Sequence, residues 1–241
     1  ASFGAGAAVI YKTFFPKTRF ILTLQEGKRL EKQNFLIKYF RNLIIRKADV
    51  TTSISNYLAN YAKHINPKAE SHVIPNGVDL NKFRHMPNSE DNVVITVSRL
   101  VTKNGVGDLV KAIAVIKKEI SDTKLIIVGS GPLEQKIRQS VRDLNLENQV
   151  IMIGSQSPEN VASYLAKAKV FVRPSLSEGL GTAFLEAMAV GLPVIGTAVG
   201  GIPDFLKDGQ TGLFCNVSDP QDLAEKIKIL LADRELRAKL I

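Results

Sequence analysis

Residues 170–190 read VFVRPSLSEGLGTAFLEAMAV, and this stretch indicates the fold around it. The apolar run Val170–Val172 predicts a buried strand, residues 174–181 a turn, and Thr182–Val190 a helix. A glycine turn at a helix start leaves backbone N–H groups unbonded, and the helix dipole favours negative charge there. We therefore expect a phosphate-type anion to bind the amides of Gly179, Leu180, Gly181 and Thr182.

Two carboxylates accompany this turn, Glu178 within it and Glu186 inside the expected helix. Carboxylates repel phosphate, but they pair well with vicinal hydroxyls, which sugars supply. Most glutamates are simply solvated, and that interpretation stays open for both. However, the helix around Glu186 has almost no polar face, so a carboxylate there needs a partner. The spacing suits an extended ligand in which ribose, diphosphate and hexose follow one another.

The composition is that of a globular protein. With 241 residues and 45% hydrophobic content, the chain can bury one large core or two modest ones. Its single cysteine, Cys215, lies in an apolar context and indicates a buried thiol in a reducing compartment, with no disulfide or metal implied. The chain starts at Ala1 within an apolar stretch and ends in a helical pattern, so we expect a fragment. The apolar run at residues 5–10 is too short to span a membrane.

The basic excess lies near the beginning of the chain. Residues 1–50 hold ten Lys and Arg against three Asp and Glu, whereas residues 91–241 hold eighteen against seventeen. Residues 28–47 combine seven cations with apolar residues that include Leu36 and Phe40 in an amphipathic pattern. Either this helix packs its apolar side on a core, or it contacts anionic lipid or an anionic acceptor. Nucleic acid is disfavoured, because no nucleic-acid motif accompanies the cations.

Apolar runs alternate with helical patterns along the chain, which predicts an α/β fold. From Val93 onward the strands lack polar alternation, so we expect a doubly wound, Rossmann-like parallel sheet covered on both faces. Residues 1–75 form an incomplete α/β remnant, 76–92 a linker, and 93–241 the main domain. The candidate strands are 20–24, 50–53, 73–74, 93–98, 125–128, 150–153, 170–172, 194–196 and 213–215.

Ligands of open α/β sheets bind at the carboxyl ends of the strands. Arg99 and Lys103 follow the first strand of the main domain and could neutralise a diphosphate, or be solvated cations. The turn around Gly131 follows the next strand, although Pro132 in the first turn of a helix would also explain it. Arg173 follows the strand at 170–172, where it either adds a cation to the cleft or extends to solvent.

Several motifs of the chain together resemble a known family, the family 4 retaining glycosyltransferases of GT-B fold. The same family is also described as glycosyl transferases group 1. The resemblance covers roughly residues 20 to 235. It rests on Ile74-Pro75-Asn76-Gly77-Val78-Asp79, Ser98-Arg99-Leu100, Pro174-Ser175, Glu178-Gly179-Leu180-Gly181, Glu186-Ala187-Met188-Ala189, Gly191-x-Pro193-Val194, Gly200-Gly201 and Asp208-Gly209-x-Thr211-Gly212.

The resemblance implies a role for each site residue. The family's first glutamate contacts the donor sugar and its second the ribose hydroxyls, which assigns Glu178 and Glu186. Arg99 and Lys103, with the amides of the glycine loop, would hold the diphosphate. We also place Gly131 and Arg173 in the donor site, because each follows an expected strand. The implied catalytic residues are Glu178, Arg99 and Lys103, and no metal or other cofactor is required.

Three positions depart from the family pattern. One is Arg173, which stands where an aliphatic residue is usual. Lysine commonly stands directly before the glycine at position 105, where this chain has Asn104 and places Lys103 one residue earlier. Gln25-Glu26 stands where many members have a histidine in the acceptor domain. Gln25 can hydrogen-bond a hydroxyl, but it lacks the protonation chemistry of histidine.

The implied function is transfer of a hexose-type sugar from a UDP-, GDP- or ADP-sugar to a glycan, glycolipid or other acceptor, with retention at the anomeric carbon. The leaving diphosphate itself would steer the attacking hydroxyl. The whole protein would act in polysaccharide or glycoconjugate assembly. We expect a cytoplasmic protein, peripheral at the inner membrane face if residues 28–47 contact lipid. Alone, the chain should bind donor with weak or no transfer.

Two alternatives stay open, a non-catalytic nucleotide-sugar-binding fragment and a GT-B nucleotide-sugar epimerase. An NAD-type enzyme is disfavoured because no G-x-G-x-x-G follows the strand at Val93.

Overall fold

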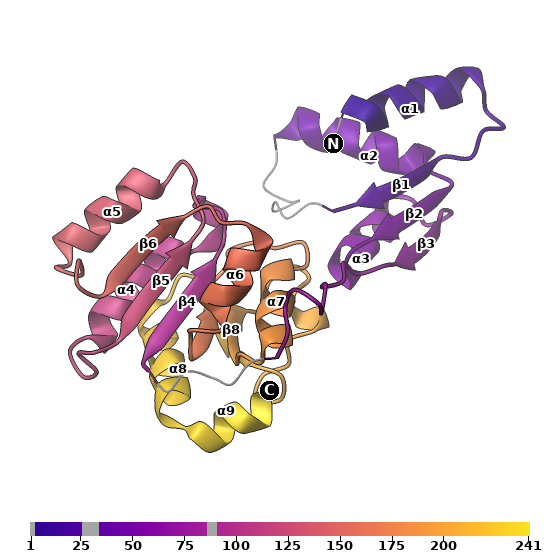
Figure 1. The fold of residues 1–241 in the computed structure, drawn as a ribbon. Helices are drawn as coiled ribbons and strands as arrows, with labels where there is room; N and C mark the ends of the chain where they lie inside the picture. Colours follow the sequence, from indigo (N-terminus) through magenta and orange to yellow (C-terminus); the bar gives the residue numbers. More distant parts are fainter. Residues whose placement is uncertain (1–2, 26–33, 86–90) are drawn as a thin grey trace. The chain divides into compact units, whose positions relative to one another are not determined.

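The computed structural model describes residues 3–25, 34–85 and 91–241 (Figure 1). The chain divides into two compact units, Ala1–Asn76 with Ser177–Leu180, and Gly77–Leu176 with Gly181–Ile241. Glu26, residues 28–33 of the basic segment and residues 86–90 of the predicted linker lie outside the described part. The assignment of residues 76–92 as a linker stays a prediction.

The first unit contains a small parallel sheet of order β1-β2-β3. Asp49 links the start of the first strand to the first helix, since its carboxylate accepts a 2.7 Å hydrogen bond from the Phe20 N–H and pairs with Lys12. The small core joins Phe20, Ile44 and Ala48 to partly buried residues of the first helix. The elements are α1 (Phe3–Phe14), β1 (Ile21–Leu24), α2 (Phe35–Lys47), β2 (Val50–Ser53), α3 (Asn56–Ile65) and β3 (Glu70–Val73).

The second unit is a six-stranded parallel sheet of order β6-β5-β4-β7-β8-β9, which confirms the predicted doubly wound fold. Its elements are β4 (Val93–Val97), η1 (Thr102–Asn104), α4 (Val106–Ile116), β5 (Lys124–Val128), α5 (Glu134–Asp143), β6 (Val150–Gly154), α6 (Pro158–Leu165), β7 (Val170–Val172), α7 (Thr182–Val190), β8 (Val194–Thr197), η2 (Ile202–Asp204), β9 (Leu213–Cys215), α8 (Pro220–Ala232) and α9 (Arg234–Leu240).

Two hydrophobic clusters cover the two faces of this sheet. Along β4, Val94 belongs to the cluster that contains α4 and α8, and Ile95 to the cluster that contains α6 and α7. Successive side chains of a strand point to opposite faces, so both positions must be apolar when helices cover both sides. This is why the strands of the second unit read as continuous apolar runs.

Each of the nine candidate strands corresponds to a strand of the structure, and the helix Thr182–Val190 is confirmed. The poorest prediction concerns β3, which was expected at 73–74 but runs Glu70–Val73. Its residues are exposed and show no apolar run, so no clear sequence signal marked its start. The prediction for Pro132 was wrong, since α5 begins at Glu134 with Leu133 as its N-cap. Cys215 is buried as expected, and burial raises the pKa of its thiol to about 12.

At Gly105, the loop after β4 packs closely against the loop after β7. The φ of this glycine, +69°, lies in the left-handed region, and a Cβ there would lie 1.9 Å from the carbonyl oxygen of Pro174. Only glycine can therefore occupy this turn without displacing the backbone that follows β7.

We expect Gly105→Ala to lower the free energy of unfolding by about 2 to 4 kcal/mol, because it combines left-handed strain with a backbone clash. Gly107→Ala is the matched control, since a Cβ at Gly107 meets nothing within 4 Å and the residue lies in α4. The control should be neutral or stabilising by up to about 1 kcal/mol. Urea denaturation of both variants measures this, and equal effects would contradict the account.

Candidate functional site

The strand order places a topological switch point between β4 and β7. From β4 the chain winds outward through β5 and β6, and then returns to pair β7 with the other edge of β4. In such sheets the loops after the two central strands diverge and open a crevice at their carboxyl ends. Arg99 follows β4 and Arg173 follows β7, so the structure brings both predicted cation positions to this edge.

Asn104 links the segments that carry these cations. Its side chain is 1% exposed, donates from Nδ2 to the carbonyl oxygen of Arg99 at 2.6 Å and accepts at Oδ1 from Arg173 Nη2 at 3.1 Å. The main chain adds a second link, because the Leu176 N–H donates to the Lys103 carbonyl oxygen at 2.7 Å. The exits of β4 and β7 are therefore held together in one network.

Glu186 lies half-buried on α7. Burial raises the pKa of its carboxyl, and the positive charge of Arg173 opposes this rise. The carboxylate thus has a charged neighbour in the same unit, as the apolar character of its helix required. An acid whose pKa is raised by burial and opposed by a nearby cation is the kind of group found at functional sites.

The glycine turn leads into α7, which begins at Thr182 as the sequence indicated. Gly181, at φ +96°, is the N-cap of α7 and has no side chain with which to cap the first-turn amides of Thr182 and Ala183. The expectation that the Gly179 N–H is unbonded was wrong, because this amide donates to Glu178 Oε1 at 3.0 Å. Glu178, Gly179 and Leu180 belong to the segment Ser177–Leu180, which groups with the first unit.

A cavity of about 360 Å³ opens at the carboxyl ends of β4, β5 and β6. Ser130 and Ser155 hydrogen-bond to each other through their hydroxyls at 2.7 Å in this region. The cavity is lined by Val97, Ser98, Arg99, Val128, Gly129, Ser130, Ser155, Gln156 and Val161. The sequence indicated the turn at 129–132 and the loop at 154–158 as strand-end segments, but it assigned no individual role to Ser130, Ser155 or Gln156. Their positions directly after strands were the signal that could have identified them.

The remaining predicted site residues differ in exposure. Arg99 is exposed and Lys103 partly exposed, so both side chains are accessible to a ligand. A Cβ at Gly131 would lie 2.5 Å from the carbonyl oxygen of Leu100. The close packing of these two loops therefore accounts for glycine at position 131.

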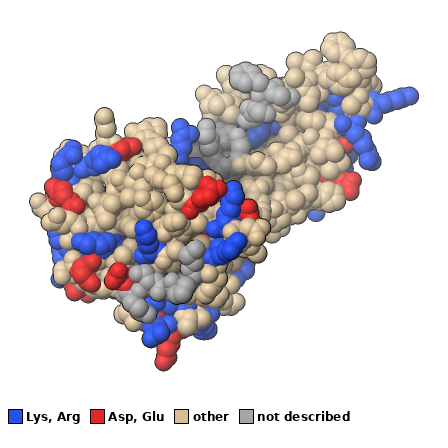
Figure 2. Space-filling model, viewed as in Figure 1, with Lys and Arg blue, Asp and Glu red and all other residues tan. Residues whose placement is uncertain are grey.

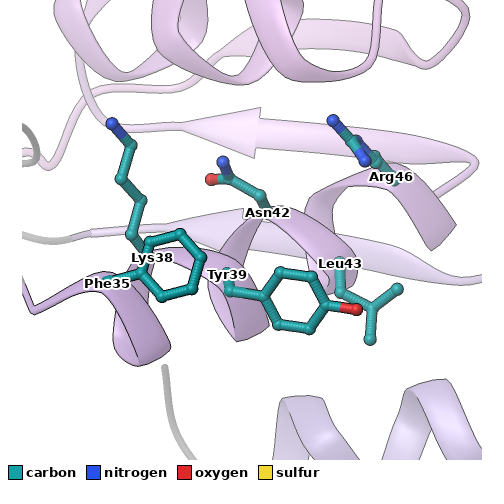
Figure 3. Close-up of a pocket in the computed structure, with 6 residues that line it drawn as sticks. All are labelled: Phe35, Lys38, Tyr39, Asn42, Leu43 and Arg46. Carbon is teal, nitrogen blue, oxygen red and sulfur yellow. The ribbon is translucent and has the colours of Figure 1, made fainter.

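In the first unit, a cavity of about 230 Å³ lies along one face of α2 (Figure 3). Its lining residues are spaced three and four apart, and Figure 3 shows Lys38, Asn42 and Arg46 along one side of the helix. The others are Phe35, Tyr39 and Leu43.

The amphipathic pattern of this helix was only partly interpreted correctly. Leu36 and Phe40, expected on its apolar side, are 61% and 57% exposed. Ile44 and Ile45 are the apolar residues that pack inward. Arg41 is a buried cation, with its guanidinium 4.8 Å from the centre of the Tyr61 ring. The described part of α2 thus exposes apolar side chains together with Lys38, Arg46 and Lys47.

In the second unit, Lys and Arg alternate with Asp and Glu on the face shown in Figure 2. Within residues 3–25, 34–85 and 91–241, no helix is long and apolar enough to cross a membrane. The same described ranges contain no group of three or more side chains suited to hold a metal ion.

The raised pKa of Glu186 predicts how stability depends on pH. The folded protein holds this proton more tightly than the unfolded chain, so ionisation costs stability once the pH exceeds the usual glutamate pKa of about 4.3. Glu186→Gln should therefore melt at a higher temperature than the wild-type chain at pH 7, and at the same temperature near pH 3.5. Thermal unfolding monitored by circular dichroism measures both. A variant that melts lower at pH 7 would show that Arg173 more than offsets the cost of burial.

Comparisons with known proteins agree with this geometry. Residues 78–241 match the family described as "Glycosyl transferases group 1". N-acetyl-alpha-D-glucosaminyl L-malate synthase of Bacillus anthracis is 35% identical over 208 residues, which cover 81% of this chain and 54% of that protein. The GDP-mannose-dependent alpha-(1-6)-phosphatidylinositol monomannoside mannosyltransferase of Mycolicibacterium smegmatis is 31% identical over 205 residues, covering 77% of this chain and 54% of that protein. The chain thus spans about half the length of these relatives.

Among solved structures, HepE of Anabaena, crystallised with UDP and glucose, superposes with a TM-score of 0.85. The match covers 98% of this chain and 68% of that chain at 22% identity, which supports the fold alone. The C-terminal domain of the group 1 glycosyl transferase LpcC from Francisella tularensis has a TM-score of 0.62 at 26% identity, covering 68% of this chain and 92% of that chain.

Proposed function

The chain belongs to the glycosyl transferases group 1 family, and we propose that it binds the nucleotide-diphosphate sugar donor of a retaining glycosyltransferase. The observation that carries the proposal is the hydrogen-bonded network of Arg99, Asn104 and Arg173 beside the half-buried Glu186. It lies at the switch point of a doubly wound sheet, where this class of fold binds nucleotides.

Each part of the donor has a group of suitable chemistry. The cavity after β4, β5 and β6 receives the base, with the hydroxyls of Ser130 and Ser155 at its wall. Glu186 accepts hydrogen bonds from the ribose hydroxyls, and the first-turn amides of α7 with Arg99 and Lys103 bind the diphosphate. Glu178 contacts the sugar, in keeping with the family pattern.

The reaction proposed for the whole protein breaks the bond between the anomeric carbon and the diphosphate oxygen. A bond from that carbon to the acceptor hydroxyl oxygen forms on the same face, and the departing diphosphate takes the hydroxyl proton. Cations and oriented amides lower the barrier because they stabilise the negative charge that grows on the leaving group. Glu178 and Glu186 within their Pro-Ser and Gly-x-Pro frame favour transfer over epimerisation.

Glu186→Ala should weaken binding of UDP, GDP or ADP, whichever the chain binds most tightly. The expected loss is about 1.5 to 3 kcal/mol, because the ribose hydroxyls lose a charged acceptor. Isothermal titration calorimetry measures it. The control is Glu147→Ala, which removes an exposed carboxylate. Glu147 precedes β6, so it lies at the amino ends of the strands, opposite the proposed site. Unchanged affinity in a folded Glu186 variant would remove its assigned role, and no nucleotide binding by the wild-type chain would refute the proposed function.

For the acceptor, we propose a lipid-linked molecule at an anionic membrane surface. The support is the exposed face of α2, where Phe35 and Phe40 accompany Lys38 and Arg46. Apolar side chains beside cations suit the interface of an anionic bilayer. The mycobacterial relative is by its name an enzyme that acts on a phosphatidylinositol monomannoside.

The chain should therefore bind liposomes that contain anionic lipid, and salt should weaken the binding. Replacing both Lys38 and Arg46 by Glu removes two surface cations, each worth about 1 kcal/mol, so affinity should fall by at least about 30-fold. The matched control replaces Lys63 and Lys68, exposed cations of the same unit, by Glu. Vesicle co-sedimentation measures both. Equal losses in the two variants, or salt-independent binding, would contradict a specific surface on α2.

A further inference from the structure

Arg173 is a buried cation fixed from two sides. Its residue is 9% exposed, and its backbone N–H donates to the Ile195 carbonyl oxygen at 3.0 Å, which anchors the exit of β7 to β8. Its Nη2 donates to Asn104 Oδ1 at 3.1 Å. A guanidinium is a planar fork, so one such contact restricts the direction of its other N–H groups.

Position 104 needs a side chain that accepts and donates at once. The amide of Asn104 accepts from Arg173 and donates to the Arg99 carbonyl oxygen. Lysine has donors only, so it could not make this pair of contacts. The amide therefore couples the side chain of Arg173 to the backbone of Arg99.

The backbone reinforces this coupling. Besides the Leu176 to Lys103 hydrogen bond, Gly105 approaches Pro174 so closely that no other residue fits there. Segments 99–105 and 173–176 therefore hold their geometry before any ligand arrives. Preorganised charge is what stabilises an anion at low cost, because binding then requires no rearrangement.

Arg173 also lies close enough to Glu186 for the two charges to influence each other. In a nucleotide diphosphate the first phosphate follows the ribose directly. A cation beside the carboxylate that accepts from ribose is therefore placed for the phosphate end of the same ligand.

We propose that Arg173 binds the diphosphate of the nucleotide and that Asn104 is the positioning residue that aims it. This inference rests on the proposed donor site and adds a specific division of labour. Arg173, which follows β7, supplies the positive charge. Asn104 supplies a neutral amide that holds the guanidinium in place.

The test separates charge recognition from general packing by comparing ligands. Arg173→Met should weaken binding of the nucleoside diphosphate that the wild-type chain prefers by 10-fold to 100-fold. It should change the affinity of the corresponding nucleoside less than 3-fold, because only the phosphates meet the guanidinium. Arg142→Met, an exposed cation on α5, is the control and should leave both affinities unchanged.

Asn104→Ala tests the positioning role. It should lower diphosphate affinity by 3-fold to 30-fold, and the double variant Arg173→Met with Asn104→Ala should bind no more weakly than Arg173→Met alone, since both changes act through one guanidinium. Calorimetry measures affinities, and melting temperatures confirm folding.

Equal losses for diphosphate and nucleoside in Arg173→Met would show a structural role and overturn the proposal. So would additive losses in the double variant, or undiminished diphosphate binding in Arg173→Met. In each case the proposed function stands if Glu186→Ala still weakens binding, whereas a wild-type chain that binds no nucleotide refutes the function itself.

Discussion

The pairing of β4 with β7 is the constraint on which the site depends. Because the chain returns to β4 after building β5 and β6, the two loops that leave the central strands diverge at one edge of the sheet. The groups assigned to the donor in the second unit follow the carboxyl ends of β4 to β7 or lie in α7. The apolar strands are buried on both faces, so the edge itself is the place where polar groups can gather.

The site concentrates groups that would be unfavourable in an ordinary core. A buried guanidinium and a half-buried carboxylate each lose hydration, and the pKa of Glu186 is raised for that reason. Asn104 offsets part of the loss at the guanidinium, because its Oδ1 accepts a hydrogen bond from Arg173 Nη2. The close approach of Gly105 to Pro174 holds the geometry. Stability is thus given up locally for a fixed arrangement of charge, which is what recognition of a diphosphate requires.

Much of this architecture could be predicted from the sequence, because doubly covered parallel strands leave continuous apolar runs. β3 was misplaced because it is exposed and has no such run. Asn104 was recognised only as a departure from a family pattern, since its partners at Arg99 and Arg173 are distant in sequence and meet through β4–β7 pairing. Ser130 and Ser155 were missed because serines in loops carry no pattern of their own. On α2, periodicity could not distinguish apolar residues that pack inward from those that remain exposed.

The proposed donor site requires that a nucleotide diphosphate binds at the carboxyl ends of β4 to β7. Titrating the ¹⁵N-labelled chain with UDP, GDP and ADP while recording amide chemical shifts tests this most directly. We expect one of them to shift the amides of Thr182 and Ala183, of the segment from Arg99 to Gly105 and of the loops at Ser130 and Ser155, and to leave α8 and α9 unchanged. Saturable shifts confined to other parts of the chain, or no shifts with any of the three, would contradict it.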